Sequence, residues 1–279
     1  MSHPEAPLGD FLRARRSSLT PADVDLPPSG QRRVPGLRRD EVARRAGISS
    51  QYYLRLEQGR DRQPSPRIID ALARALRLDQ HGVAYMSRLV AREASSVLEV
   101  LSPVCPTPER LLAPYATQAA FVTDSNFDIL ATTDVARALS DGEWVAGANL
   151  VASVFSARMR STVEGWEGAA RRVVASLRFR SDPYDSRLQA LVGGLAIRDA
   201  DFRRIWARHE SRPTYSETFR QQVAGLGSIG LLAQTFHVPA APGWTLTAVV
   251  PDAREDASVA AVAYLAAGGS VPEQPADAA

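Results

Sequence analysis

The most regular pattern of apolar and polar positions in the chain lies in the stretch LRRDEVARRAGISSQYYLRLEQ, which starts at Leu37. Val42 and Ala46 share one face of a predicted helix, and Tyr53 and Leu56 share one face of a second. Both faces are apolar, whereas the positions between them are mostly charged or polar. The pattern therefore predicts two short amphipathic helices, one directly after the other.

The predicted connection between these helices is a tight turn. Gly47 can take the left-handed conformation that ends a helix, and Ser49 can cap the first amides of the next one. Ala43 is small at the point where the first helix must approach the second. Because so short a turn makes the two helices cross, the pattern predicts a helix-turn-helix, whose second helix lies in the DNA major groove. A helical hairpin inside a larger bundle is the alternative.

Three more helical patterns surround this pair. They predict helices over 8–19 and 78–90, and another that begins at Ser65-Pro66, where Ser65 serves as the cap and proline is tolerated in the first turn. Residues 20–36 are rich in proline, glycine and aspartate and predict an extended excursion. Together the patterns predict a compact all-α domain of five helices.

After a proline-rich stretch, SPVCPTP, the pattern becomes mixed. We predict strands over 120–124, 127–131, 229–238 and 245–250, and helices over 134–140, 169–179, 188–208 (broken near Gly193-Gly194) and 258–267. Strands at both ends of a helical middle predict an α+β domain with an antiparallel sheet. The predicted organisation is a helix-turn-helix domain over 1–95, a linker over 96–108, an α+β domain over 109–267 and a frayed tail over 268–279.

Charge is distributed unevenly between the two halves of the chain. Residues 1–92 contain 17 Arg and 10 acidic residues, whereas residues 93–279 contain 16 Arg and 21 acidic residues. A basic half joined to an acidic half favours a nucleic-acid-binding module fused to a domain with another task. The single cysteine, Cys105, and the lack of a signal peptide or a membrane-length apolar run predict a cytoplasmic protein.

Over residues 8–90 the chain resembles the Xre-type helix-turn-helix regulators. The fuller pattern LGDFLRARR…VPGLRRDEVARRAGISSQYYLRLEQGRDRQPSP is similar to the narrower MmyB-like group, which has a long insertion between its first two helices. The resemblance implies a lambda-repressor-like domain followed by a PAS-like α+β domain, which binds a small ligand, fatty acids among the candidates. In the second domain Phe127-Asp-Ile-Leu-Ala, Asn149-Leu150, Trp166 and the block from Phe202 to His209 follow the family order.

Two positions depart from the family pattern. Thr132-Thr133-Asp134 replaces the usual Trp-Asn-Pro, and Val223-Ala224 replaces the usual His-Pro. If these positions shape the pocket, we expect either a ligand that differs from that of the family or no ligand at all.

The resemblance also implies the DNA contacts. Ser50, Gln51 and Arg55 correspond to positions that face base edges, and Arg39 to one that grips a phosphate. A phosphate contact or a pair near Glu57 is the alternative for Arg55, and Glu57 itself is expected to pair with an arginine. We predict DNA contacts from Arg38, Arg39, Ser49, Ser50, Gln51, Tyr52, Arg55 and Arg60.

Ligand contacts are predicted in the second domain, with His209 as the foremost candidate. The alternative for each candidate is an ordinary packed or solvated side chain. The predicted set is Phe127, Phe155, Trp206, Arg208 and His209.

Catalytic chemistry has little support, because the four histidines are scattered and no phosphate loop or metal-ligand spacing occurs. We therefore predict no enzyme activity, no cofactor and no metal. The leading hypothesis is a ligand-responsive regulator that binds a double-stranded DNA operator as a homodimer, away from membranes. An adaptor that senses a protein partner and an enzyme with a DNA-targeting module are the alternatives.

Overall fold

The computed structural model describes residues 7–26, 36–61, 63–90 and 107–269. The chain divides into two compact units, one of residues 1–98 and 203–212 and the other of residues 99–202 and 213–279. Cys105 and most of the predicted linker lie outside the described residues, as does much of the predicted excursion.

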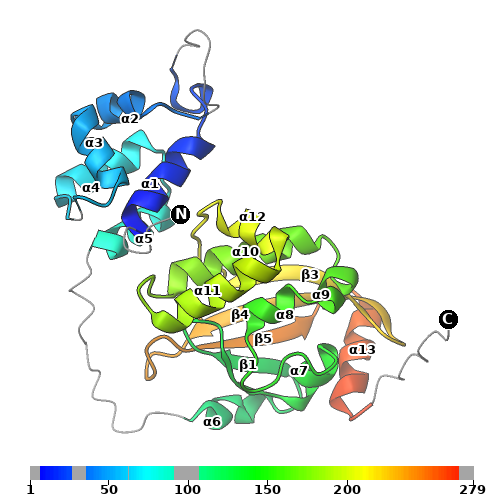
Figure 1. Cartoon of the computed structure of the whole chain (residues 1–279). Helices are drawn as coiled ribbons and strands as arrows, with labels where there is room; N and C mark the ends of the chain where they lie inside the picture. Colours follow the sequence, from blue (N-terminus) through cyan, green and yellow to red (C-terminus); the bar gives the residue numbers. More distant parts are fainter. Residues whose placement is uncertain (1–6, 27–35, 62, 91–106, 270–279) are drawn as a thin grey trace. The chain divides into compact units, whose positions relative to one another are not determined.

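The first unit contains the five predicted helices (Figure 1). They are α1 (Pro7–Ser18), α2 (Arg39–Ala46), α3 (Ser50–Glu57), α4 (Pro66–Ala75) and α5 (Gln80–Val90), with a 3-10 turn, η1 (Ala22–Val24), after α1. Their apolar faces meet in one core, in which Phe11, Leu12, Val42, Tyr53, Leu56, Leu72 and Met86 are almost completely buried. Each large apolar side chain buried in this way contributes about 1.5–3 kcal/mol relative to an exposed one.

The turn between α2 and α3 has the predicted geometry. Gly47 is left-handed, with φ +66°, and its N–H reaches the carbonyls of Ala43 and Arg44. The hydroxyl of Ser49 accepts the N–H of Tyr52 over 3.1 Å and so caps α3.

The cap of α4 differs from the prediction. Ser65 occupies the N-cap position, but its hydroxyl makes no capping hydrogen bond. Its carbonyl accepts the N–H groups of Ile68 and Ile69, and Pro66 occupies the first helical position as predicted.

The second unit is built on a five-stranded antiparallel sheet with the strand order β2-β1-β5-β4-β3. The strands are β1 (Ala119–Thr123), β2 (Ile129–Thr132), β3 (Ser216–Val223), β4 (Gly227–His237) and β5 (Thr245–Pro251). Four of them were predicted, whereas β3 was missed, because its sequence SETFRQQV is mostly polar. Its pairing with β4 over eight positions makes it a strand.

The described residues contain eight further helices. They are α6 (Pro108–Leu112), α7 (Asp134–Leu139), α8 (Leu150–Val154), α9 (Ala157–Thr162), α10 (Trp166–Arg180), α11 (Ser186–Arg198), α12 (Ala200–Trp206) and α13 (Asp256–Ala266); a 3-10 turn, η2 (Ala113–Tyr115), follows α6. The predicted helix over 188–208 is two helices. The break comes at Asp199, whose carboxylate caps α12 by accepting the N–H of Phe202, and not at Gly193-Gly194.

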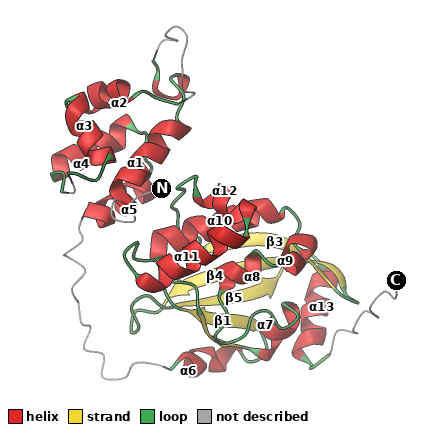
Figure 2. Ribbon diagram, in the orientation of Figure 1, coloured by secondary structure: helices red, strands yellow, loops and turns green. Residues whose placement is uncertain are grey.

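Figure 2 shows α8, α10 and α11 above one face of the sheet. Side chains of β1 alternate between the two faces, as an extended strand requires. Phe121 and Thr123 point to the face under these helices, whereas Ala120 and Val122 pack against Leu112 of α6 on the other face. The helical layer and the sheet enclose the cavity described below.

Candidate DNA-binding surface and ligand cavity

The N-terminal end of α3 presents polar side chains at the surface of the first unit. Ser49, Ser50 and Gln51 are exposed, since the opposite face of the helix buries Tyr53 and Leu56 in the core. Seven of the eight predicted DNA-contact residues are exposed, and Tyr52 is partly buried. The surface thus offers hydroxyl, amide and guanidinium groups, the types that bind base edges and phosphates.

Arg38 and Arg39 stand at the beginning of α2. The carboxylate of Glu41 accepts the backbone N–H of Arg38 over 2.7 Å, which leaves the Arg38 side chain exposed beside the helix N-terminus. The side chain of Arg39 is 50% exposed, yet its Nε donates to Glu57 over 2.7 Å. Arg39 therefore links two helices and still reaches the surface.

Glu57 is the polar centre of the first unit. Its carboxylate is 1% exposed and also accepts Nε of Arg16 over 2.6 Å, while its carbonyl accepts the guanidinium of Arg13. Burial alone would raise the pKa of Glu57, but the hydrogen bonds from Arg16 and Arg39 hold it below its usual value. The expected pairing of Glu57 with an arginine is confirmed, and two arginines share it.

Arg55 lies on the exposed face of α3, next to Tyr52. Its guanidinium lies 5.4 Å from the centre of the Tyr52 ring and 3.5 Å from the carboxylate of Asp61. The pair suggested near Glu57 is thus made with Asp61. Partial burial, together with Asp61, raises the pKa of the Tyr52 hydroxyl, so Tyr52 is a neutral donor at physiological pH.

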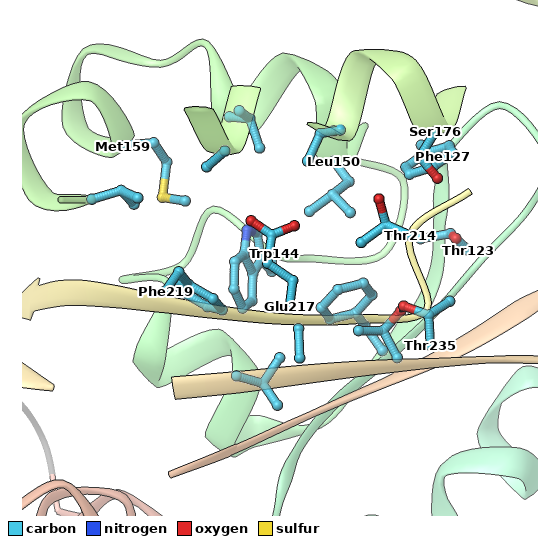
Figure 3. Close-up of a pocket in the computed structure, with 18 of the residues that line it drawn as sticks. Thr123, Phe127, Trp144, Leu150, Met159, Ser176, Thr214, Glu217, Phe219 and Thr235 are labelled. Atoms are coloured by element: carbon cyan, nitrogen blue, oxygen red, sulfur yellow. The ribbon is translucent and has the colours of Figure 1, made fainter. Parts of the chain in front are cut away.

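The second unit contains a cavity of about 130 Å³ between its sheet and its helical layer (Figure 3). A cavity of this size can hold a small organic molecule, because one of about 150 Å³ binds benzene. Most of its wall is apolar, and Phe121, Trp144, Leu150, Val154, Met159 and Trp166 are among the side chains that form it. Such a wall with a few polar groups is typical of small-molecule sites.

Polar side chains interrupt the wall at a few positions. Thr235 and Thr247 line the cavity from adjacent strands, and their hydroxyls lie 2.9 Å apart. Glu217 lines it from β3, with its carboxylate bonded to Nε of Arg172 over 2.5 Å. The two threonine hydroxyls thus bond each other, and the charge of Glu217 is balanced by Arg172.

Phe127 enters the cavity from the turn between β1 and β2. Its backbone is left-handed, with φ +65°, a conformation that costs free energy for a residue with a side chain. Asp124 holds the turn, because its carboxylate accepts the N–H groups of Asn126 and Asp128. The turn thereby places an aromatic ring in the wall of the cavity.

Arg180, at the end of α10, covers this ring. Its guanidinium lies 4.5 Å from the centre of the Phe127 ring and donates to the carbonyls of Asp124 and Gly243 over 2.9 and 3.2 Å. Burial lowers the pKa of Arg180 to about 10, against the opposite effect of the Asp124 carboxylate. The side chain is therefore a partly buried cation at neutral pH.

Of the predicted ligand contacts, the structure places only Phe127 in the wall of this cavity. Phe155 packs edge-on against Trp166 and Phe202, with ring centres 5.4 and 5.2 Å apart, and belongs to an aromatic cluster. Trp206, Arg208 and His209 belong to the segment grouped with the first unit and do not line the cavity. A ligand contact by His209 stays a prediction.

The way in which α12 ends explains why the predicted contacts from Trp206 to His209 do not share one helix face. The helix stops at Trp206, and His209 is left-handed, with φ +51°, so the block from Trp206 to His209 does not continue as one helix face. The two departures from the family pattern, at 132–134 and 223–224, also lie outside the cavity wall. Arg180 and Trp144 were missed, because no local pattern marks them.

No helix in the described part of the chain is long and apolar enough to cross a bilayer. The same residues contain no group of three or more histidine, cysteine or acidic side chains able to hold a metal ion.

Two family models match the chain. Residues 104–265, more than half of the chain, match a family model described as the MmyB-like transcription regulator ligand binding domain. Residues 7–86 match one described as a helix-turn-helix domain. A search of curated proteins finds no match.

Proposed function

Because the chain belongs to the MmyB-like transcription regulators, we propose that a small apolar or fatty-acid-like ligand in its cavity controls binding to a double-stranded DNA operator. The chain is a DNA-binding transcription regulator with a ligand-sensing domain, and the proposal concerns the ligand and its effect. The observation that carries it is the cavity of about 130 Å³ with a largely apolar wall. A ligand acts only if it binds the DNA-competent and DNA-incompetent states with different affinity.

The proposed DNA contacts are the exposed groups around α3. Gln51 and Arg55 read base edges, since amide and guanidinium side chains can bond adenine and guanine bidentately. Arg38, Arg39 and Arg60 bind phosphates, and Tyr52 reaches the backbone with its neutral hydroxyl. The exposure of the glutamine and the four arginines supports the assignment, and Tyr52 is partly exposed beside them.

We further propose that the regulator binds its operator as a homodimer. One recognition helix reads only a few base pairs, whereas two copies read two half-sites. The proposal includes no catalytic step. Selection of operators from random DNA checks the dimer, since a two-fold symmetric consensus is expected and a single half-site would contradict it.

The ligand hypothesis is tested by extracting the purified full chain with organic solvent and identifying co-purifying molecules by mass spectrometry. Operator binding is then titrated by fluorescence anisotropy with and without the extracted molecule. The variant Ala169→Phe fills the cavity from α10, and Ala157→Phe makes the same change at an exposed position of α9 outside it.

We expect the ligand to shift operator affinity in the wild type and in Ala157→Phe, but not in Ala169→Phe. Equal ligand responses of the two variants would show that the cavity is not the sensing site. A protein partner that shifts operator affinity while the extracted molecule does not would favour an adaptor.

A further inference from the structure

Two polar groups in the cavity wall each lack one kind of partner: one lacks a hydrogen-bond acceptor, and the other lacks a directly paired carboxylate. The first is the indole N–H of Trp144, a residue that is 4% exposed. Its Nε1 is buried and has no hydrogen-bond acceptor among the described residues. Figure 3 shows the indole standing in the cavity between the strands and the helices. A buried donor without an acceptor is costly, and native proteins rarely leave one unexplained.

The second group is the guanidinium of Arg180. It bonds two backbone carbonyls through one nitrogen and lies over the Phe127 ring. Among the described residues, the Asp124 carboxylate influences Arg180 by its charge and not by a side-chain hydrogen bond. Other arginines around the cavity are neutralised, as Arg172 is by Glu217 and Arg160 by Asp199. Arg180 is therefore a cation in the wall without a direct ion pair, and the Asp124 carboxylate acts on it only through its nearby charge.

The two groups lie at separate places along the cavity. Trp144 packs against Phe121 in the middle of β1, with ring centres 5.3 Å apart. Arg180 bonds the carbonyl of Asp124, three residues further along, which is about 10 Å in an extended strand. Apolar side chains, Leu150 and Val154 among them, form much of the remaining wall.

We propose that the cavity binds a small amphiphilic acid whose carboxylate pairs with Arg180 and whose apolar body carries an oxygen that accepts the indole N–H of Trp144. The inference rests on the proposed ligand-sensing function and defines its ligand class. A guanidinium binds a carboxylate by charge-assisted hydrogen bonds, and a site built to hydrogen-bond its ligand rejects analogues that lack the matching group. An unsubstituted fatty acid satisfies Arg180 and leaves Trp144 without an acceptor.

The test uses isothermal titration calorimetry of the full chain at neutral pH. The probes are 1-hexanol, hexanoate, and oxo-hexanoates that differ in the position of the keto group. We expect hexanoate to bind at least about tenfold tighter than 1-hexanol, and one oxo-hexanoate about tenfold tighter than hexanoate. Equal affinity for 1-hexanol and hexanoate, or for hexanoate and every oxo-hexanoate, would overturn the inference.

Two variants separate the two contacts. Arg180→Gln should abolish the preference for hexanoate over 1-hexanol, whereas Arg180→Lys keeps the charge and should retain most of it. Trp144→Phe keeps a ring against Phe121 and should abolish only the preference for the oxo-hexanoate. The matched surface control is Arg137→Gln on α7, which lies outside the cavity wall and should change neither preference. Circular dichroism melts verify that each variant is folded.

A measurement on the wild type does not depend on variant folding. In a nitrogen-15 spectrum the indole resonance of Trp144 should shift when the preferred oxo-hexanoate binds and stay nearly unchanged with 1-hexanol. An unmoved Trp144 resonance with a bound oxo-hexanoate would overturn the contact. Binding without discrimination refutes this inference alone, whereas a ligand that binds as inferred but leaves operator affinity unchanged refutes only the proposed function. Failure of every probe to bind counts against both.

Discussion

Nε of Arg39 lies 2.7 Å from Oε2 of Glu57, and this contact joins the first residue of α2 to the last residue of α3. The two residues are 18 positions apart, so the ion pair closes the helix-turn-helix across its whole length. Half of the Arg39 side chain remains exposed at the helix N-terminus. One arginine can thus hold the recognition helix in place and bind a DNA phosphate.

Arg39→Ala should therefore lower both stability and DNA affinity. Loss of the hydrogen bond to Glu57 is expected to cost about 1 kcal/mol. Loss of one phosphate contact should weaken binding to all sequences and make the salt dependence of log K shallower by about one unit. Chemical denaturation and anisotropy at several salt concentrations measure the two effects. Arg74→Ala, at an exposed position of α4, is the control, and an equal salt slope in both variants would remove Arg39 from the phosphate contacts.

Substitutions at Gln51 and Arg55 should change sequence preference. Each good bidentate contact discriminates against a wrong base by about 1–3 kcal/mol, so Gln51→Ala and Arg55→Ala should relax the consensus at separate positions. For Arg55 the variant also removes the contacts with Tyr52 and Asp61. Operator selection from a random library reads out the preference, and an unchanged consensus in both variants would argue that neither residue reads bases.

The stability of the first unit should fall in acid because of Glu57. The pKa of Glu57 is lowered in the folded protein, so its contribution is fully present above its unfolded pKa, about 4.3, and is lost as the pH falls through the folded pKa. Glu57→Gln removes this dependence and is expected to cost about 3 kcal/mol at neutral pH, since Arg16 and Arg39 lose their buried partner. Hydrogen exchange of amides in α1 and α3 follows the unit locally. An equal acid dependence in wild type and Glu57→Gln would assign it to other carboxylates.

Two glycines in helices should respond oppositely to alanine. A Cβ on Gly9 of α1 would lie 2.4 Å from the carbonyl oxygen of Glu57, so Gly9→Ala must push α1 away from α3 and should cost about 1–3 kcal/mol. Gly193 of α11 has open space around it, and Gly193→Ala should stabilise its helix by up to about 1 kcal/mol. Hydrogen exchange within each unit separates the effects. A tolerated Gly9→Ala would mean that the two helices can move apart at little cost.

Local patterns of residues along the chain were sufficient to predict most of the helices and strands. The 3.6-residue spacing of apolar residues, the left-handed Gly47 and the Ser49 cap act between near neighbours, so they predicted the helix-turn-helix directly. The same holds for the mostly apolar strands β1, β2, β4 and β5 and for the resemblance that pointed to a ligand-sensing second domain. The exposed DNA-contact candidates follow from these helices, because exposure is the complement of a buried helix face.

Contacts between residues far apart in the sequence determined the remaining features, which are the strand β3, the ion pairs and the cavity. The polar strand β3 is a strand because β4 pairs with it, and Arg39 meets Glu57 because two helices cross. Three residues from separate elements line the cavity: Phe127 lies in a strained turn, Trp144 in the segment after α7, and Arg180 at the end of α10. No sequence spacing encodes that convergence, because each side chain reaches the cavity through the packing of a different element on the sheet. The sequence by itself therefore determined most of the elements and the family, whereas only the tertiary structure decided which charges pair and which side chains line the cavity.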